Sequence, residues 1–130
     1  AMDYGSEVEQ RFLSPSRVGE FEEGTPGLVS GEAQDRTLIV WIRFQVQVLD
    51  GTIRAARFNV YGCPYTVAAA DWAAEWLEGR PSEALTKLGM RERHQALGVP
   101  VEKLGNLLVL EDAAVQCRLE LESGQGWKGS

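Results

Sequence analysis

A cysteine stands in this sequence where a strand-like pattern gives way to a helical one. Cys63 follows Gly62 and precedes Pro64, and proline is a favoured first residue of a helix. The sequence therefore predicts that Cys63 caps the start of that helix, where unpaired N–H groups and the positive end of the helix dipole face its sulfur. Such a position favours the thiolate, which is both a nucleophile and a metal ligand. The alternative is a small core residue at the same corner, because free cysteine is among the most buried residue types.

The other residues that could share this chemistry are predicted to be structural. Cys117 lies on the apolar stripe of the last predicted helix, so we expect it in the core. His94, the single histidine, has charged and polar neighbours and is expected at the surface. Asp71 is interpreted either as a surface acid or as a neighbour of the thiol. No second thiol or histidine lies at metal-ligand spacing from Cys63, and we find no P-loop, dinucleotide or Ser-His-Asp motif, so neither a metal site nor a catalytic residue is predicted.

The composition indicates a soluble globular domain with an acidic surface. The 130 residues include 19 aspartates and glutamates against 13 lysines and arginines, a net charge of −6, which argues against nucleic acid because phosphate binding needs clustered basic side chains. The apolar runs end before the roughly 20 residues that a membrane span needs, and no basic-then-apolar leader is present. We therefore expect no membrane partner, a cytoplasmic location and free thiols.

The first half of the chain is predicted to form a short helix and an antiparallel hairpin. Apolar and more polar residues alternate from 38 to 48, which is the clearest strand signal in the sequence. Asp50-Gly51 follows directly, and this dipeptide is typical of a two-residue hairpin turn. The predicted elements are a helix over Glu7–Leu13, an exposed loop or frayed edge strand over 19–34, and strands over Leu38–Val48 and Ile53–Tyr61. The core face of the first long strand is expected at Leu38, Val40, Ile42, Phe44, Val46 and Val48.

The second half is predicted to be helical. Beyond Pro64 the apolar period becomes that of a helix, with Gly79 and Pro81 ending it. Its stripe is expected at Val67, Ala70, Ala74 and Leu77, and further helical patterns cover Ser82–Leu88, Arg91–Leu97 and Leu104–Leu121. Strands early and helices late predict an α+β fold, a small antiparallel sheet of about three strands covered by helices. We expect one domain over residues 1–122 and a disordered tail over 123–130.

Four motifs are distributed over nearly the whole chain. The segment from Asp50 to Cys63 reads D-G-x-I-x-x-A-R-F-x-x-Y-G-C, and E-W-x-x-G follows from Glu75. The segment from Tyr4 to Gly19 reads Y-x-x-x-V-x-x-x-F-x-x-P-x-x-V-G, and E-D-A begins at Glu111. In combination these motifs resemble the IscU/NifU N-terminal family of iron-sulfur cluster assembly scaffolds, and the resemblance implies that family's fold.

The resemblance also locates the positions where this chain differs from the family. Members of the family hold a cluster or metal with three cysteines, an aspartate two residues after the first cysteine, and a histidine just before the third. Here Gln34 and Arg36 stand at the first-cysteine and aspartate positions, although an insertion leaves the alignment of residues 31–40 open. Gly105 and Asn106 stand at the histidine and third-cysteine positions. Because neutral amide oxygens are poor substitutes for thiolates toward iron, we do not expect a complete family-type cluster on one subunit.

The resemblance implies a divergent scaffold-like protein of iron-sulfur or sulfur-transfer metabolism, a carrier rather than an enzyme. Cys63 would accept sulfur, or would be the single ligand of an iron-sulfur cluster shared between subunits or with a partner. The implied partner is a cysteine desulfurase, and the alternative is a non-catalytic binding module that docks or regulates one without holding a cluster. The family's chaperone loop reads V-P-V-E-K here, which keeps Pro100 and Lys103 as a partner loop but loses a double proline, and this argues against an Hsp70-type chaperone.

Overall fold

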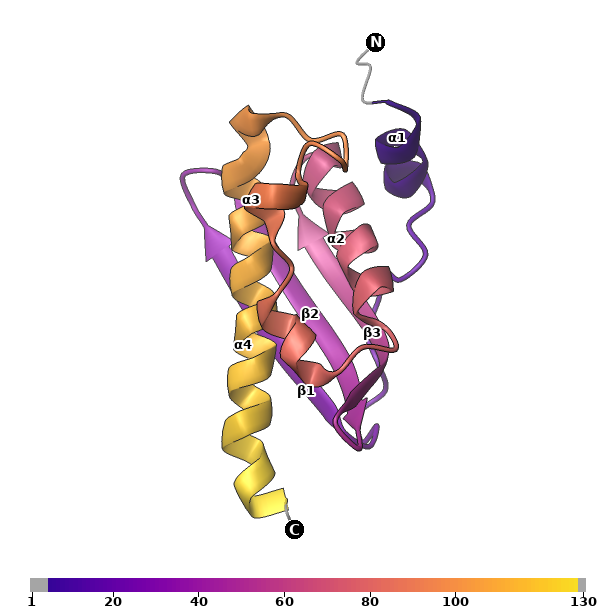
Figure 1. Cartoon of the computed structure of the whole chain (residues 1–130), viewed down its shortest axis with the longest axis vertical. Coiled ribbons are helices and arrows are strands. Elements are labelled where there is room, and N and C mark those ends of the chain that lie inside the picture. The colour runs from indigo at the N-terminus through magenta and orange to yellow at the C-terminus, as the bar shows by residue number, and fades with distance from the viewer. Residues whose placement is uncertain (1–4, 129–130) are drawn as a thin grey trace.

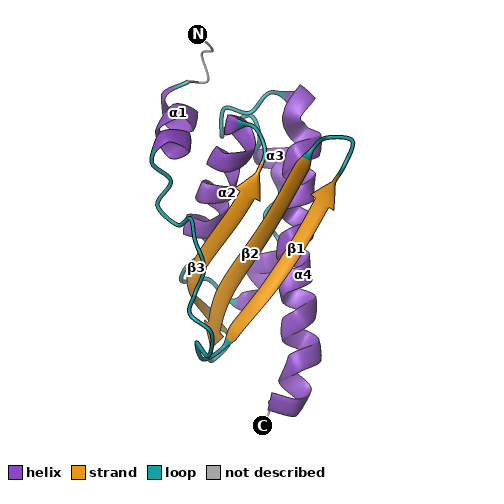
Figure 2. Cartoon of the chain, turned by 180° about the vertical axis from the view of Figure 1, so that it is seen from behind, coloured by secondary structure: helices purple, strands orange, loops and turns teal. Residues whose placement is uncertain are grey.

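The protein is an α+β structure in which helices cover one face of a three-stranded antiparallel sheet, as predicted (Figure 1). The computed structural model describes residues 5–128. The strands follow one another in the order β1-β2-β3, and the long helices α2 and α4 lie across the same face of the sheet (Figures 1 and 2). The elements are α1 (Ser6–Leu13), β1 (Leu28–Asp35), β2 (Val40–Leu49), β3 (Thr52–Tyr61), α2 (Pro64–Leu77), η1 (Ser82–Thr86), α3 (Met90–Arg93), η2 (Val101–Lys103) and α4 (Leu104–Lys128).

The central strand β2 has the alternating burial that its sequence predicts. Its even-numbered side chains, from Val40 to Val48, are buried against the helices, and the odd-numbered ones are half-buried on the other face. The expectation that Leu38 belongs to this core face is wrong. Ile39 has a positive φ of 57°, which turns the chain, so the strand begins at Val40 and Leu38 is exposed in the turn.

A tight turn joins β2 to β3, and β1 completes the sheet on the other side of β2. Asp50 and Gly51 have φ values of 54° and 73°, the two positive angles that a tight two-residue hairpin turn needs. The segment 19–34, which we expected to be an exposed loop or a frayed edge strand, contains both. It remains irregular until Gly27 and then forms β1, which pairs with β2 from Leu28 to Asp35 at the edge of the sheet.

The helix α4 lies directly on β1 because β1 has a glycine at the point of contact. A Cβ atom added at Gly31 would overlap the carbonyl oxygen of Ala113 and the backbone nitrogen of Cys117, and it would lie 2.9 Å from the Cys117 Sγ. The apolar stripe of α4 is buried as predicted at Leu107, Leu110, Ala114 and Cys117, and Leu121 is partly buried. The small residues of α2 pack in the core beside β3: Ala70, Ala73 and Ala74 are completely buried with Leu77, and Val67 is half-buried.

The connection between α2 and α4 is less helical than its sequence suggests. The segment over Ser82–Leu88 forms only the short 3₁₀ helix η1, and the one over Arg91–Leu97 forms a single turn, α3, from Met90 to Arg93. His94 is buried rather than at the surface, with 7% of its area exposed, because its Nδ1 lies 2.8 Å from the Val99 carbonyl oxygen and closes the turn that follows.

The last helix is also longer than expected. Its backbone continues to Lys128, so Ser123–Lys128 are helical here and differ from the disordered tail that we expected. Residues 129–130 of that tail lie outside the described residues. Across residues 5–128, no helix has the length and apolar character that a membrane span requires.

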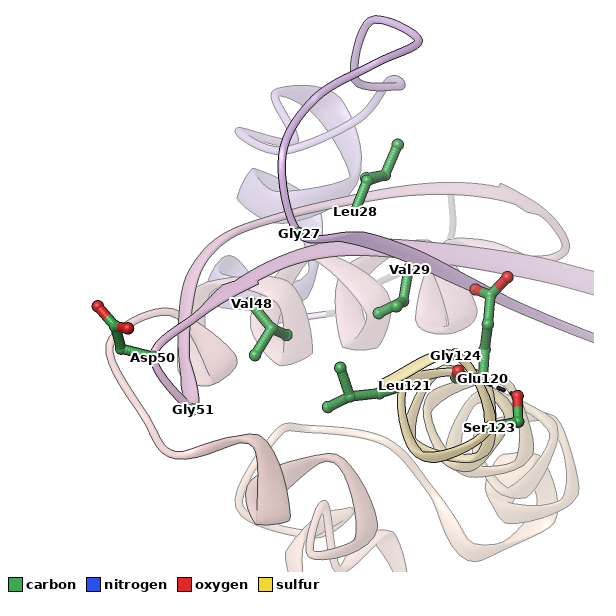
Figure 3. Close-up of a pocket in the computed structure, with 10 residues that line it drawn as sticks. All are labelled: Gly27, Leu28, Val29, Val48, Asp50, Gly51, Glu120, Leu121, Ser123 and Gly124. Carbon is green, nitrogen blue, oxygen red and sulfur yellow. Dashed lines mark hydrogen bonds between the residues drawn. The ribbon is translucent and has the colours of Figure 1, made fainter. Parts of the chain in front are cut away.

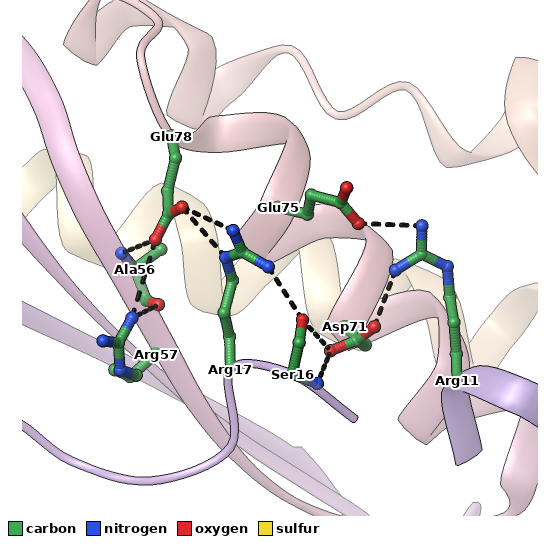
Figure 4. Close-up of polar contacts among 8 residues, drawn as sticks. All are labelled: Arg11, Ser16, Arg17, Ala56, Arg57, Asp71, Glu75 and Glu78. Carbon is green, nitrogen blue, oxygen red and sulfur yellow. Dashed lines mark hydrogen bonds and ion pairs between the residues drawn. The ribbon is translucent and has the colours of Figure 1, made fainter. Parts of the chain in front are cut away.

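An ion-pair network fastens the N-terminal segment to α2 (Figure 4). Asp71 is 2% exposed, and its carboxylate accepts hydrogen bonds from Arg11 at 2.6 Å and from the Ser16 backbone N–H at 2.7 Å. Arg11 also pairs with Glu75. Asp71 is therefore not the surface acid that we expected as one alternative, and its partners Arg11 and Ser16 belong to the N-terminal segment rather than to the thiol corner.

The same network closes one edge of the sheet. Phe58 of β3 donates its N–H to the Arg17 carbonyl and accepts from the Gly19 N–H, so residues 17–19 run along the outer side of β3. Glu78, at the end of α2, accepts from the Arg17 guanidinium and from the Ala56 N–H, each at 2.9 Å. The outer edge of β3 is thereby covered by the N-terminal segment and one carboxylate.

The electrostatic environment of Glu78 makes this contact sensitive to acid. Burial alone raises the pKa of Glu78, but the hydrogen bonds from Arg17 and Ala56 and the charges of Arg17 and Arg57 outweigh it, so the pKa lies below its ordinary value of 4.5. A carboxylate with a lowered folded-state pKa stabilises the folded protein above its unfolded-state pKa, and this contribution is lost as the pH falls through the folded-state value.

We predict that Gly31→Ala lowers the free energy of unfolding by about 3 kcal/mol, because the added methyl group forces α4 away from β1. The measurement is urea unfolding followed by circular dichroism. Gly124→Ala is the matched control: it adds the same methyl group to α4 where no heavy atom lies within 4 Å, and it should be neutral or raise stability by up to about 1 kcal/mol. Equal stabilities of the two variants would contradict the close contact at Gly31.

We predict that Glu78→Gln lowers the free energy of unfolding at pH 7 by about 1–3 kcal/mol, because it removes the charge from the hydrogen bonds with Arg17 and Ala56. The difference from the wild type should shrink as the pH is lowered from the ordinary pKa of glutamate through the lower folded-state pKa of Glu78, because Glu78 then becomes protonated in the folded protein. Urea midpoints measured across this range test the prediction. A difference that does not change with pH would show that the charge of Glu78 contributes nothing.

Candidate functional site

Cys63 occupies the corner that its sequence predicts, between the end of β3 and the first turn of α2. Its backbone is extended, with φ −79° and ψ 169°, and Pro64 is the first residue of the helix. The Cys63 carbonyl accepts hydrogen bonds from the N–H groups of Thr66 and Val67, at 2.9 and 3.1 Å. These bonds make Cys63 the N-cap residue of α2, and its side chain is a free, half-buried thiol.

A threonine lies directly behind this thiol. Thr66 is completely buried, and its Oγ1 lies 3.5 Å from the Cys63 Sγ. Gly62 packs closely against it, because a Cβ atom at Gly62 would lie 3.1 Å from the Thr66 Cβ. The Gly-Cys-Pro-x-Thr sequence thus folds into a compact corner in which the third residue of the helix faces the capping residue, as in other helix caps.

An asparagine from α4 completes the contact. Asn106 is 6% exposed, and its Nδ2 donates a hydrogen bond of 3.2 Å to the Thr66 Oγ1. Because the Thr66 oxygen accepts from Asn106, the Thr66 hydroxyl hydrogen is available to donate to the sulfur of Cys63. The structure therefore joins a thiol, a hydroxyl and an amide from two helices in one short chain of polar contacts.

The turn between β1 and β2 forms the third side of the site. A Cβ atom at Gly105 would lie 3.2 Å from the Leu38 Cδ1, so this turn contacts the first turn of α4. Asp35 shapes the turn, because its carboxylate accepts a hydrogen bond of 3.0 Å from the Leu38 N–H. The elements that carry Cys63, Asn106 and Leu38 thus converge at one end of the sheet (Figure 1).

The four positions that we expected to correspond to family ligands are not equivalent in the structure. Asn106 is linked to Cys63 through Thr66, and Gly105 lies beside it at the turn. Gln34 pairs with Trp41 in the sheet and is exposed on the face away from the helices, because the residues of β1 that face the helices are odd-numbered. Arg36 is exposed in the turn, and no described hydrogen bond connects it or Gln34 to Cys63.

Exposed apolar side chains surround this end of the molecule. Leu38 and Ile39 come from the turn between β1 and β2, Tyr61 from the end of β3, and Val101 from η2. The last three each have about two-thirds of their area exposed. We call these four residues the apolar rim. The expected partner loop lies beside it: Pro100 precedes η2 and accepts the Lys103 N–H at 2.9 Å.

The donor atoms at this site do not fit a complete iron-sulfur cluster or a structural metal. Within residues 5–128, no three histidine, cysteine, aspartate or glutamate side chains lie close enough together to hold a metal ion. Cys117 packs in the core with its thiol 3.5 Å from the Phe44 carbonyl, and burial raises the pKa of that thiol far above its usual range. Cys63 is left with a hydroxyl and an amide, which are weak ligands for iron.

A separate cavity of about 450 Å³ lies at the other end of the sheet (Figure 3). It is bounded by the Asp50-Gly51 turn and by the later part of α4, with Val48 and Leu121 pointing into it. None of the residues that line it belongs to the corner around Cys63.

Neither Thr66 nor the contact of Asn106 with it was predicted from the sequence. A threonine three residues after a predicted cap is a recognisable signal, because side chains at that position face back toward the cap. The contact with Asn106 joins residues that are 40 positions apart, and no periodicity within either helix reveals it.

Comparison with known proteins places this geometry in context. The chain matches the family model described as NifU-like N terminal domain over residues 3–119. It is 27% identical over 113 residues to the iron-sulfur cluster assembly scaffold protein IscU of Azotobacter vinelandii, an alignment that covers 86% of this chain and 88% of that protein. It is 29% identical over 114 residues to the iron-sulfur cluster assembly protein 1 of Arabidopsis thaliana, covering 85% of this chain and 67% of that protein.

The fold has a counterpart among solved structures. The crystal structure of a NifU-like protein (N-terminal) from Brucella abortus superposes with a TM-score of 0.73 and covers 92% of this chain and 94% of that one. The two sequences are only 15% identical, so this likeness concerns the fold.

We predict that Thr66→Val slows the alkylation of Cys63 by iodoacetamide at pH 7 by about threefold to tenfold, because a hydrogen bond to the sulfur contributes about 0.5–1.5 kcal/mol. Mass spectrometry of the Cys63 peptide gives the alkylation rate. The pH dependence of this rate separates an effect on thiolate formation from an effect on the access of iodoacetamide to the sulfur. Thr66→Ser is the matched control, since it keeps the hydroxyl and should retain the wild-type rate. Equal rates for both variants would mean that the hydroxyl does not act on the thiol.

Proposed function

Because this chain belongs to the NifU-like N terminal domain family, we propose that it takes part in iron-sulfur cluster assembly, as a scaffold-like carrier and not as a catalyst. Relatives that align with most of this chain are named as iron-sulfur cluster assembly scaffold proteins, which supports the process. Both cysteines are free thiols, which suits a reducing compartment such as the cytoplasm.

In this proposal Cys63 accepts sulfur from a cysteine desulfurase. Its thiolate attacks the outer sulfur of a persulfide on the desulfurase; the sulfur–sulfur bond of the donor breaks, the donor cysteine leaves as a thiolate, and Cys63 becomes the persulfide. One observation carries the proposal: the Cys63 thiol is half-exposed at the first turn of α2, with the Thr66 hydroxyl 3.5 Å behind it. The first feature gives a partner access to the thiol, and the second gives its sulfur a neighbouring hydrogen-bond donor.

A single thiol limits what the protein can carry alone. The resemblance implies that the amide of Asn106 replaces a thiolate of the family, and Gln34, the expected counterpart of the first cysteine, lies on the face of the sheet away from the helices, so three cluster ligands from one chain are lacking. A cluster could use Cys63 only as a ligand shared with a second subunit or a partner. Sulfur transfer needs one thiol and no further ligand, and for this reason it fits the site better.

The apolar rim favours the second candidate, a binding module that docks or regulates a cysteine desulfurase. Ile39, Tyr61 and Val101 expose apolar area around the thiol, where a protein partner could cover it together with the loop at Pro100 and Lys103. In that case docking is the function, and the thiol at Cys63 is not needed for it.

We predict that anaerobic incubation with cysteine and a cysteine desulfurase adds one sulfur, about 32 Da, to the wild-type chain and none to Cys63→Ala. Intact-mass spectrometry checks this outcome. Cys117→Ala is the matched control for the location of the sulfur and should be modified like the wild type. The visible spectrum, recorded with iron present, should stay without the absorption of a cluster.

The other outcomes are each informative. A chromophore in wild type and not in Cys63→Ala would mean that a cluster forms with Cys63 as a shared ligand, and it would overturn the assignment of Cys63 to sulfur transfer alone. Desulfurase binding that persists in Cys63→Ala, without any added mass in the wild type, would overturn sulfur transfer in favour of the binding module. Failure of both transfer and binding would overturn both candidates.

A further inference from the structure

The outer edge of β1 has hydrogen-bonding groups that nothing in the described structure uses. The Val48 N–H donates to the Gly27 carbonyl, so odd-numbered residues of β1 bond to β2 and even-numbered ones point outward. The Ser30 N–H confirms this alternation, because it points away from β2 and donates to the carboxylate of Glu120 on α4. The backbone groups of Glu32 and Gln34 point the same way.

The two edges of the sheet therefore differ. The β3 edge is covered by residues 17–19 and by Glu78. At the β1 edge, no strand or loop within residues 5–128 is hydrogen bonded to the backbone of Glu32 or Gln34, and Figure 2 shows β1 as the outermost strand with α4 behind it. Exposed edges of this kind accept an added strand.

A groove runs along the same edge. It has a volume of about 720 Å³ and lies between β1 and the outer side of α4, where Leu119 is half-exposed. The exposed carboxylates of Glu32 and Glu120 line it, from β1 and α4 respectively. Arg43 also lines it but is neutralised by Glu20 at 2.8 Å. The groove thus combines acidic and apolar contacts beside free backbone groups.

Charge decides which strand fits this edge. A second copy of the chain would bring its own Glu32 and Glu120 to the same place, and like charges facing each other across strands are destabilising. The net charge of −6 adds to that repulsion. A basic strand meets the opposite situation, since its lysines or arginines would face Glu32 while its alternate apolar side chains contact Leu119.

We propose that the outer edge of β1 binds an extended, basic segment of a partner protein as a fourth strand of the sheet. The segment alternates basic and apolar residues, because successive side chains of a strand point to opposite faces. The backbone groups of Glu32 and Gln34 hold it, and the carboxylates of Glu32 and Glu120 select its charge. This surface is separate from Cys63 and does not depend on sulfur transfer.

The test uses the full chain and a fluorescent peptide of about ten residues that alternates lysine and valine. Fluorescence anisotropy should detect binding, and amide hydrogen exchange should slow at Glu32 and Gln34. Two matched peptides separate the contributions: one N-methylated at alternate residues, which cannot pair with a strand, and one with glutamate in place of lysine. Each should bind at least about tenfold more weakly.

Variants of the chain locate the site. Gln34→Pro removes an outward N–H without removing a hydrogen bond to β2, and Glu32→Lys reverses the charge at the edge. Each should weaken peptide binding at least about fivefold. Glu9→Lys is the matched control, because it makes the same charge change on α1, which lies beside α2 at the other side of the molecule (Figure 1), and it should bind like the wild type.

Three results would overturn the proposal. Equal binding of the N-methylated peptide would mean that charge alone attracts it. Binding of the peptide to Glu32→Lys with the wild-type affinity, together with no slowing of amide exchange at Gln34, would locate the peptide elsewhere. Sedimentation as a dimer that Gln34→Pro converts to a monomer would assign the edge to a second copy of this chain.

Discussion

The contact between the α4 backbone and β1 at Gly31 positions the rest of the structure. No side chain separates the helix from the strand there, so the axis of α4 is fixed close to the sheet. With that axis fixed, the first turn of α4 reaches both the Leu38 turn and the beginning of α2. A single small residue in an edge strand thereby determines where Asn106 stands relative to Cys63.

The thiol corner depends on both the local sequence and the packing of distant segments. The cap geometry of Cys63 depends on local sequence, Gly62 before it and Pro64 after it, whereas its polar neighbours depend on the packing of two helices. Asn106 of α4 has a structural role here, because its side chain is hydrogen bonded to the buried Thr66 hydroxyl and is not open to a metal. The chemistry of the site therefore depends on one sulfur atom, the Sγ of Cys63.

Much of the fold could be predicted from the sequence, because its main signals are local. The alternation along β2, the Asp50-Gly51 turn and the proline after Cys63 each act on neighbouring residues, and all three predictions are confirmed. His94 and Asp71 were misjudged for the opposite reason. The polar neighbours of His94 suggested exposure, and Asp71 was interpreted as a surface acid or a neighbour of the thiol, but their partners are a backbone carbonyl in a later turn and an arginine 60 residues away. Such contacts exist only once the chain has folded.

The different protection of the two sheet edges has a consequence for self-assembly. A sheet with two free edges can pair the β1 edge of one copy with the β3 edge of the next, and such head-to-tail contacts propagate into filaments. Residues 17–19 occupy the β3 edge, so this propagation is blocked at the first step. The N-terminal segment therefore acts as a terminator of strand polymerisation, and it leaves the protein with one edge at which a single strand can be added.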